Sequence, residues 1–198
     1  MQSDYCVLER EGPDTYPLLG WDQSGRAFRK GTAVHVTEPI RLRLRTPVPG
    51  TPVMVDHHSL PAPVLSTRLK EVLAPLSLYN VQLVPADVRV GDAVLRYWLL
   101  HVHNEVPCMD KARSVFELSS CGRLVLSLDK LVLDENVLAD IPLERRLVFV
   151  LAEATSVCLV HCSVIDRMLS LTPRPQGLRF IPVTEWSDAA GFRGDTSS

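Results

Sequence analysis

The sequence predicts an α+β fold: a mixed, mostly antiparallel sheet with two related helix–strand units packed on it. The main observation is a pattern that occurs twice. Residues 65–73 and 161–169 each place apolar side chains at helical spacing, and residues 81–88 and 178–183 then alternate apolar and polar side chains. The first spacing is typical of an amphipathic helix and the second of a half-buried strand. We therefore expect a helix followed by a strand at both places.

The first unit carries signals for both ends of its helix. Leu69 and Leu73 fall on one face. Ser66 can cap the first turn, because its hydroxyl can accept a hydrogen bond from a free backbone N–H. Pro75 ends the helix, because proline lacks the amide hydrogen and clashes with the preceding turn. The strand that follows is expected to end in the pair Val84–Pro85.

The second unit repeats these features. Ser163 and Asp166 have the spacing of a capping box at the start of a helix. Pro173 and Pro175 follow the helix, and the next strand ends in the pair Ile181–Pro182. The expected apolar stripe of this helix consists of Cys162, Ile165, Met168 and Leu169.

Further strand-like segments lie outside the repeat. Residues 10–31 and 47–63 are rich in glycine or proline and are expected to be loops. Residues 131–138 fit either a strand or a helix. The expected strands are residues 4–9, 34–37, 40–45, 94–103 and 145–151, with a hairpin of residues 113–118 and 122–133.

The chain shows no low-complexity linker that would separate domains. We expect one α+β domain over residues 1–187, built from two related halves at about 1–103 and 104–187. The last residues, 188–198, are small and polar and are expected to form a flexible tail. A chain of 198 residues with 46% hydrophobic residues is long enough to bury a core of this size.

The charge balance bears on the kind of partner. Lys and Arg number 21 and Asp and Glu 23, a net charge of −2, which argues against a nucleic-acid binder that neutralises phosphates. Arg41, Arg43 and Arg45 alternate along a predicted strand, so they line one face. A solvated strand face is the simpler interpretation, and an acidic partner is the alternative.

The sequence predicts a cytoplasmic protein without a membrane segment. The longest apolar run, residues 147–152, is strand-sized and far short of the ~20 residues that cross a membrane. The first ten residues have no basic start and no apolar run, so no signal peptide is expected. Five cysteines, an odd number, are then expected to be reduced thiols.

One group of residues suggests nucleophilic chemistry. Cys108 lies near His101, His103 and Asp110 in the sequence, an arrangement that could belong to a cysteine-dependent hydrolase. No glycine-rich turn surrounds Cys108, however, and isolated Cys and His residues carry little information about catalysis.

A second group suggests a metal site. Cys158 and Cys162 lie four residues apart with His161 between them, which on a helix would place two thiols on one side. No second pair completes a zinc site, and small apolar residues in a core stripe are the alternative. His57 and His58 are expected in a surface loop, and Asp134 and Glu135 are expected to be solvated. We therefore expect no catalytic residue, cofactor or metal ion.

The middle of the chain resembles a bacterial immunity protein family. The relevant segment, residues 97–114, has an aromatic strand followed by Asn104, then Cys108 and Asp110 as Cys-x-Asp, then Ser114. Residues 130–134 and both helix–strand units resemble other blocks of the family, so the likeness covers about residues 60–186. Proteins of this family are encoded beside polymorphic or contact-delivered toxins and were long described as a domain of unknown function.

The resemblance implies a non-enzymatic binder that neutralises a cognate toxin encoded by an adjacent gene. The partner-binding residues are not identified by the sequence, although the loops before the two helices are the expected variable surface. Trp98, Cys108 and Trp186 are expected to serve in core packing. A cysteine-dependent hydrolase and a regulatory or scaffold domain without a toxin partner remain as alternatives.

Overall fold

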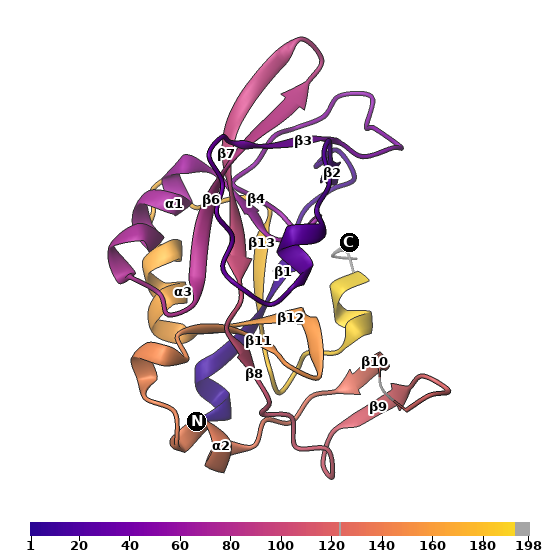
Figure 1. Cartoon of the computed structure of the whole chain (residues 1–198), viewed down its shortest axis with the longest axis vertical. Coiled ribbons are helices and arrows are strands. Elements are labelled where there is room, and N and C mark those ends of the chain that lie inside the picture. Colours follow the sequence, from indigo (N-terminus) through magenta and orange to yellow (C-terminus); the bar gives the residue numbers. More distant parts are fainter. Residues whose placement is uncertain (123, 193–198) are drawn as a thin grey trace.

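The computed structural model describes residues 1–122 and 124–192, in which strands form two sheets and a separate hairpin (Figure 1). Most neighbouring strands are antiparallel, whereas β3–β6 and β8–β11 are parallel pairs. The α+β class with a mixed, mostly antiparallel arrangement is therefore confirmed. The single sheet of the prediction is in fact two sheets joined by helices.

The strands of the six-stranded sheet come from the first part of the chain. In spatial order they are β2 (Leu19–Trp21), β3 (Ile40–Leu44), β6 (Val81–Val90), β7 (Ala93–Val102), β5 (Val64–Leu65) and β4 (His57–His58).

The five-stranded sheet and the hairpin use mainly the second part. The sheet order is β13 (Leu178–Pro182), β1 (Tyr5–Arg10), β12 (Ala154–His161), β11 (Val148–Leu151) and β8 (Glu105–Val106), and the hairpin pairs β9 (Val115–Leu118) with β10 (Val125–Lys130).

The helices are short. They are α1 (Thr67–Leu73), α2 (Glu135–Ala139) and α3 (Cys162–Leu169), with 3-10 turns η1 (Gln2–Asp4), η2 (Arg26–Arg29), η3 (Ala74–Leu76), η4 (Leu143–Arg145) and η5 (Asp188–Phe192). None of the helices in the described part of the chain is long and apolar enough to cross a membrane.

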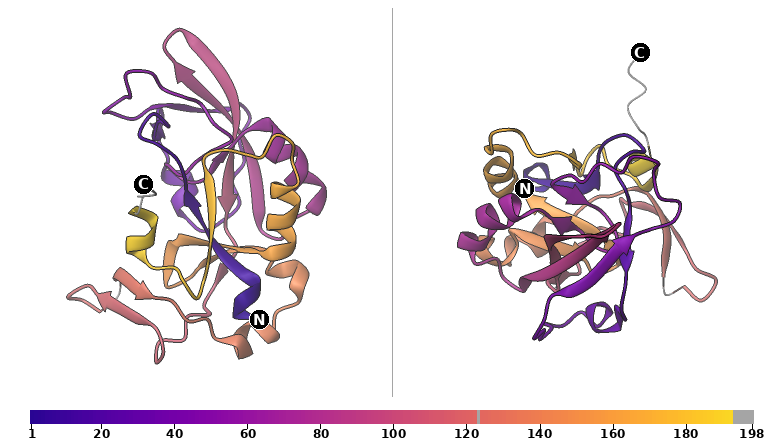
Figure 2. Two further views of the ribbon diagram at one scale, coloured as in Figure 1. Left: turned by 180° about the vertical axis from the view of Figure 1, so that it is seen from behind. Right: turned by 90° about the horizontal axis from the view of Figure 1, so that it is seen from above.

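Helices α1 and α3 pack against each other on one flank of the molecule, α1 against β7 of the six-stranded sheet and α3 against β12 of the five-stranded sheet (Figures 1 and 2). We call the apolar cluster at this place the central core. Leu69 and Leu73 of α1 and Ile165 and Met168 of α3 are buried in it. Strands of both sheets contribute to the same cluster, with Leu8, Val148, Val150, Cys158, Val160 and Leu178 from the five-stranded sheet and Leu65 and Leu100 from the six-stranded sheet.

Each sheet also has a core of its own on its other face. The five-stranded sheet packs Tyr5, Phe149 and Leu159 against α2 and the segment that leads into and out of the hairpin. The six-stranded sheet packs Leu42, Ala86 and related residues beneath the loops that surround it. Both faces of the five-stranded sheet are therefore covered, which shapes the sequence pattern of its strands.

The predicted start of α1 is confirmed, whereas that of α3 is wrong. The Ser66 hydroxyl accepts a hydrogen bond from the Leu69 amide at 3.5 Å. At α3 the cap is His161, whose Nδ1 accepts from the Ser163 amide at 3.2 Å. Strand β12 runs directly into α3, so the last extended residue is His161 and Ser163 already lies inside the helix. Cys162, expected in the apolar stripe, is exposed.

Strand β12 was not predicted because its pattern does not alternate. Residues 157–160 are all buried, since one face meets the central core and the other meets the core of the five-stranded sheet. Residues 34–37, expected to be a strand, are irregular. The backbone N–H and C=O of Val34 bond to the Gln82 side-chain amide at 2.8 and 2.9 Å, which replaces a strand partner. Strand β2 and turn η2 lie within the predicted loop 10–31.

Other elements differ from their predicted bounds by a few residues. The expected strand 145–151 is shorter, because η4 occupies its beginning and β11 starts at Val148. The ambiguous segment 131–138 is irregular and then helical, with Asp134 capping α2 through bonds from the Asn136 and Val137 amides. Asp134 is therefore a capping residue rather than part of a solvated pair.

The two repeated units occupy different places in the two sheets. Strand β13 is an edge strand that ends at Pro182, whereas β6 is an interior strand that continues to Val90. Pro85 is tolerated within β6 because β3 pairs with β6 only from Ala86 onward. Descent of the two units from one ancestral repeat stays a prediction.

The chain crosses between the expected halves at its start. Strand β1 pairs with β12 and β13, so residues 5–10 belong to the sheet that is otherwise built from residues 105–182. Residues 188–192, expected to be part of a tail, form η5, and the Asp188 carboxylate accepts a hydrogen bond from the Leu128 amide at 2.7 Å. The rest of the expected tail, 193–198, lies outside the described residues.

The central core makes a direct test of the fold possible. Leu69→Asp or Ile165→Asp would bury an unpaired carboxylate between the sheets, and we expect a loss of about 3–5 kcal/mol in the free energy of unfolding. Urea unfolding followed by circular dichroism measures this. The matched control is Leu126→Asp, because Leu126 is 65% exposed and the same change should alter stability by about 0.5 kcal/mol at most. A wild-type midpoint for both core variants would contradict the assigned packing.

Candidate functional site

Asn104 joins the two sheets at the point where β7 gives way to β8. Its side-chain amide donates to the Arg145 carbonyl at 2.8 Å and to the Val148 carbonyl at 3.0 Å. The Asn104 carbonyl in turn accepts from the Val150 amide at 2.9 Å. Because Asn104 is buried and these groups are paired, its role is to fix the turn between the sheets.

The other residues of the family-like segment hold the base of the hairpin. The Cys108 carbonyl accepts from the Asp134 amide at 2.7 Å, and the Asp110 amide donates to the Val132 carbonyl at 2.8 Å. The Ser114 hydroxyl completes this link, since it donates to the Val132 carbonyl and accepts from the Val132 amide, at 3.2 and 3.0 Å. The segment before β9 and the segment after β10 are thereby tied together.

Asp110 also orients Arg113. Its carboxylate accepts hydrogen bonds from the amides of Ala112 and Arg113, at 3.0 and 3.1 Å, and from Arg113 Nε at 2.7 Å. Desolvation acts to raise the pKa of Asp110, but these hydrogen bonds and the guanidinium charge outweigh it and leave the pKa below its usual range. Asp110 is thus an ionised turn residue that fixes one edge of the Arg113 guanidinium.

This geometry does not support a hydrolase at Cys108. Cys108 is fully buried in the core of the five-stranded sheet, and burial first of all, with nearby Glu153 and Asp134, raises the pKa of its thiol to about 12. His101 lies on the six-stranded sheet, where its Nε2 bonds to the Thr32 carbonyl and its ring meets Phe28. A nucleophile needs a base within hydrogen-bonding distance, and the structure does not bring these two residues together.

The arrangement that could have begun a metal site does not form in the described part of the chain. Cys158 lies on β12 and is buried, whereas Cys162 is exposed at the start of α3, so the two thiols do not share one side of a helix. No group of three or more His, Cys, Asp or Glu residues within residues 1–122 and 124–192 could hold a metal ion.

The prediction of a surface loop for His57 and His58 is wrong. Both histidines are buried on β4, and each bonds through Nδ1 to a backbone carbonyl at 2.8 Å, His57 to Gly177 and His58 to Pro17. A carbonyl only accepts, so each Nδ1 carries the proton. Burial lowers the pKa of His57 to about 4, against the opposing effect of the Gly177 bond. Two neutral histidines therefore tie loops to the six-stranded sheet.

The predicted exposure of the arginines is confirmed. Arg41, Arg43 and Arg45 are exposed, while the alternating Ile40 and Leu42 on the opposite face are buried. Arg43 lies 3.9 Å from Asp22, which is the distance of a weak surface ion pair.

Among the described residues, the hairpin carries the largest group of exposed apolar side chains. Val115, Leu118, Leu124 and Leu126 are 53, 48, 63 and 65% exposed, and we call these four residues the hairpin surface. The hairpin projects from the body of the molecule in all three ribbon views (Figures 1 and 2). Phe116 and Val125 pack against the body instead. Exposed apolar residues gathered on one element mark an interaction site more often than single scattered ones do.

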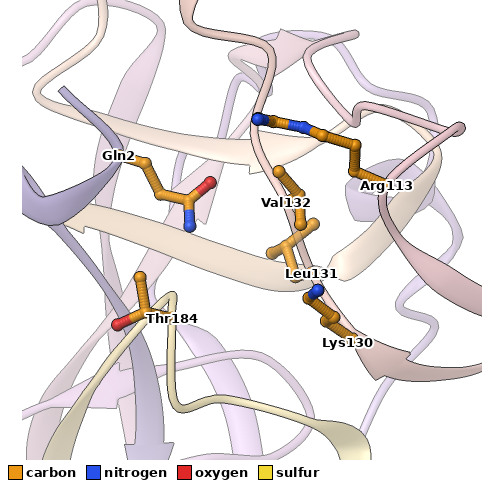
Figure 3. Close-up of a pocket in the computed structure, with 6 residues that line it drawn as sticks. All are labelled: Gln2, Arg113, Lys130, Leu131, Val132 and Thr184. Atoms are coloured by element: carbon orange, nitrogen blue, oxygen red, sulfur yellow. The ribbon is translucent and has the colours of Figure 1, made fainter.

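A pocket of about 370 Å³ opens at the base of the hairpin. Its floor is the buried pair Leu131 and Val132, and the polar groups of Gln2, Arg113 and Lys130 stand around it (Figure 3). Thr184 completes the lining. Lys130 pairs across the hairpin with Val115, so the pocket and the hairpin surface are continuous.

Sequence reasoning missed this surface although it placed the hairpin correctly. A signal was present in residues 124–128, Leu-Val-Leu-Ser-Leu, because a two-stranded hairpin has only one face to bury. Apolar residues that do not fit on that buried face must be exposed to solvent. The other expected surface, loops before both helices, does not exist at α3, since β12 runs directly into that helix.

Thiol labelling tests the burial of Cys108. At neutral pH we expect iodoacetamide to modify the exposed Cys121 and Cys162 within minutes and to leave Cys108 unmodified in the folded protein. Peptide mass mapping locates the label, and denatured protein serves as the control in which all five cysteines react. Rapid modification of Cys108 in the native protein would contradict the buried thiol.

The buried histidines predict a loss of stability in mild acid. The folded-state pKa of His57, about 4, lies below the ordinary value of 6.5, so the unfolded chain takes up a proton that the folded chain refuses. Stability is therefore full above pH 6.5 and falls as the pH drops towards 4, by up to about 3 kcal/mol for this residue.

Urea unfolding at pH 7.5, 6 and 5 measures this pH dependence. His57→Gln should reduce the change in the free energy of unfolding with pH. His35→Gln, the same change at an exposed histidine, should leave it as in the wild type. Equal slopes in all three proteins would show that His57 does not stay neutral in the fold.

The comparisons with known proteins agree with the likeness seen in residues 97–114. A model described as the immunity protein family Imm11 matches residues 7–185. No curated protein matches the chain. The matched range runs from β1 to the turn after β13 and includes both sheets, the central core and the hairpin. The chain therefore belongs to the Imm11 immunity protein family.

Proposed function

We propose that this protein neutralises a cognate toxin by binding it, without catalysis, in the cytoplasm of the cell that makes both. The toxin is expected to be the product of an adjacent gene. Membership of an immunity protein family supports the biological role. The single observation that carries the mechanism is the hairpin surface, which exposes four large apolar side chains on an element that projects from the body.

The hairpin is suited to contact by its construction. Its base is fixed by the bonds of Asp110 and Ser114 to the Val132 backbone, so the strands leave the body at a defined angle. Preorganisation lowers the entropy cost of association. The exposed apolar side chains, together with Arg113 and Lys130 at the hairpin base, supply the apolar and polar groups that protein interfaces combine.

The toxin would be blocked by occlusion. An interface of standard size covers about 800 Å² on each partner, so a projecting hairpin could enter or cover an active cleft. The fully buried Cys108 offers no support to the alternative of a cysteine-dependent hydrolase.

Co-expression with the adjacent reading frame tests the function. We expect that product to be lethal alone and harmless together with this protein. Leu124→Asp or Leu126→Asp should abolish protection and weaken binding at least about 30-fold, since central apolar contacts carry most of the energy of an interface. Calorimetry with a catalytically inactive toxin measures the affinity.

Val94→Asp is the matched control. Val94 is 61% exposed at the start of β7, in the six-stranded sheet and far along the chain from the hairpin. It should leave protection and affinity unchanged. A harmless adjacent product, or a lethal one that this protein does not neutralise, would refute the proposed function. Full protection by both leucine variants would refute only the use of the hairpin.

A further inference from the structure

The pocket at the base of the hairpin is lined by hydrogen-bond donors. Arg113 and Lys130 are cationic, and among the described residues that line the pocket none is acidic. Arg113 uses Nε for Asp110 at 2.7 Å, and within the described residues no hydrogen bond occupies its two terminal nitrogens. A guanidinium has five N–H groups, so most of its donors remain available.

Gln2 adds a third donor, and its orientation is determined by its partner. The Leu133 amide donates to Gln2 Oε1 at 2.7 Å. A backbone N–H cannot accept, so the atom that it meets must be the carboxamide oxygen, and the NH₂ group must be the other atom. The Gln2 backbone amide is also held, by Glu135 Oε1 at 2.6 Å. Gln2 is therefore fixed from two sides with its donor group left over.

The arrangement of these donors suits a small anion-bearing group. Figure 3 shows the Arg113 guanidinium, the Lys130 ammonium and the Gln2 carboxamide around the side chains of Leu131 and Val132. A volume of about 370 Å³ is at the small end of the range for ligand pockets. The apolar floor would contact the methylene groups of a side chain while the donors around it meet its oxygens.

We propose that this pocket receives an aspartate or glutamate side chain of the cognate toxin. The inference rests on the proposed function and adds a chemical requirement to it. Val115 lies opposite Lys130 in the hairpin. The edge of a toxin interface that contacts the hairpin surface would therefore lie over the pocket. The matching toxin surface is therefore an apolar patch with a carboxylate beside it.

Asp110 has a positioning role in this recognition. Its bond to Nε holds the guanidinium by one edge, and the opposite edge with the terminal nitrogens remains for a bidentate contact with a carboxylate. Lysine could not replace Arg113 here, because an ammonium group has no planar second edge.

Binding measurements with the full chain and the inactive toxin test the proposal. Lys130→Glu should weaken binding about 10-fold or more, and Arg113→Gln should weaken it by a similar factor. Raising the salt concentration from about 50 to 500 mM should weaken wild-type binding several-fold and have less effect on both variants. Circular dichroism confirms that each variant is folded.

Two control variants carry the same charge changes outside the pocket. Lys111→Glu alters an exposed lysine beside the hairpin base, and Arg89→Gln alters an arginine that is 66% exposed on β6. Both should bind within about 2-fold of wild type. Each acidic residue of the toxin patch is then replaced by lysine in turn. We expect one of these toxin variants to bind the Lys130→Glu protein more tightly than it binds the wild-type protein.

The outcomes separate the two proposals. If Leu126→Asp abolishes binding while Lys130→Glu and Arg113→Gln bind like wild type, the pocket is not part of the interface and this inference is wrong, although the proposed function stands. If the pocket variants weaken binding no more than Lys111→Glu does, the effect is general electrostatics and the inference is again wrong. If the wild-type protein binds no toxin, both proposals fail.

Discussion

The fold depends on one apolar contact layer that both sheets share. Helix α1 follows the six-stranded sheet's strand β5 and helix α3 follows the five-stranded sheet's strand β12, yet both helices bury their stripes in the central core. Neither helix exceeds eight residues, and helices of that length are not stable alone in water. Each helix exists because the other helix and both sheets cover its apolar face. The two parts of the chain therefore share the central core.

The same layer bears on where the proposed recognition surface lies. With the central core on one face and a second core on the other, the five-stranded sheet has no face left for a partner. The six-stranded sheet also packs a core on each face, and the exposed residues of β3 and β6 include the charged Arg43 and Arg89, which lie about 4 Å from the same Asp22. The hairpin is the element of the described chain that combines apolar exposure with independence from both sheets.

Sequence reasoning succeeded where local physics decides the outcome. The helix α1, its cap Ser66 and the hairpin position follow from periodicity, capping chemistry and turn residues, which act within a few positions along the chain. It failed where distant residues decide. Strand β12 is apolar throughout because two cores meet it, and His57 is buried because Gly177 supplies an acceptor 120 residues away. No local pattern contains that information.

The candidate site shows the same division. Asn104, Cys108, Asp110 and Ser114 could be picked out from the sequence, but their roles could not, because each acts on the backbone of residues 130–150. Cys108 and the histidines look reactive in sequence and turn out to be structural. The residues of the hairpin surface look like core residues in the sequence, because they belong to a strand pattern, but their side chains are exposed in the structure. The buried Cys108 and histidines differ from the exposed hairpin residues in the burial of their side chains, which the sequence shows only indirectly.

In the proposed function the hairpin separates recognition from stability. Val115, Leu118, Leu124 and Leu126 lie outside all three apolar cores, so substitution there alters the exposed surface without opening a cavity in the fold. Exposed strands carry a cost, because unpaired edges invite association between copies. Strand β10 limits that hazard in two ways: two register shifts interrupt its ladder, and the Asp188 carboxylate occupies the Leu128 amide. An edge protected in this way can present apolar side chains to a partner while its backbone is a poor template for another strand. On β10, the proposed partner would then contact side chains rather than pair with the backbone.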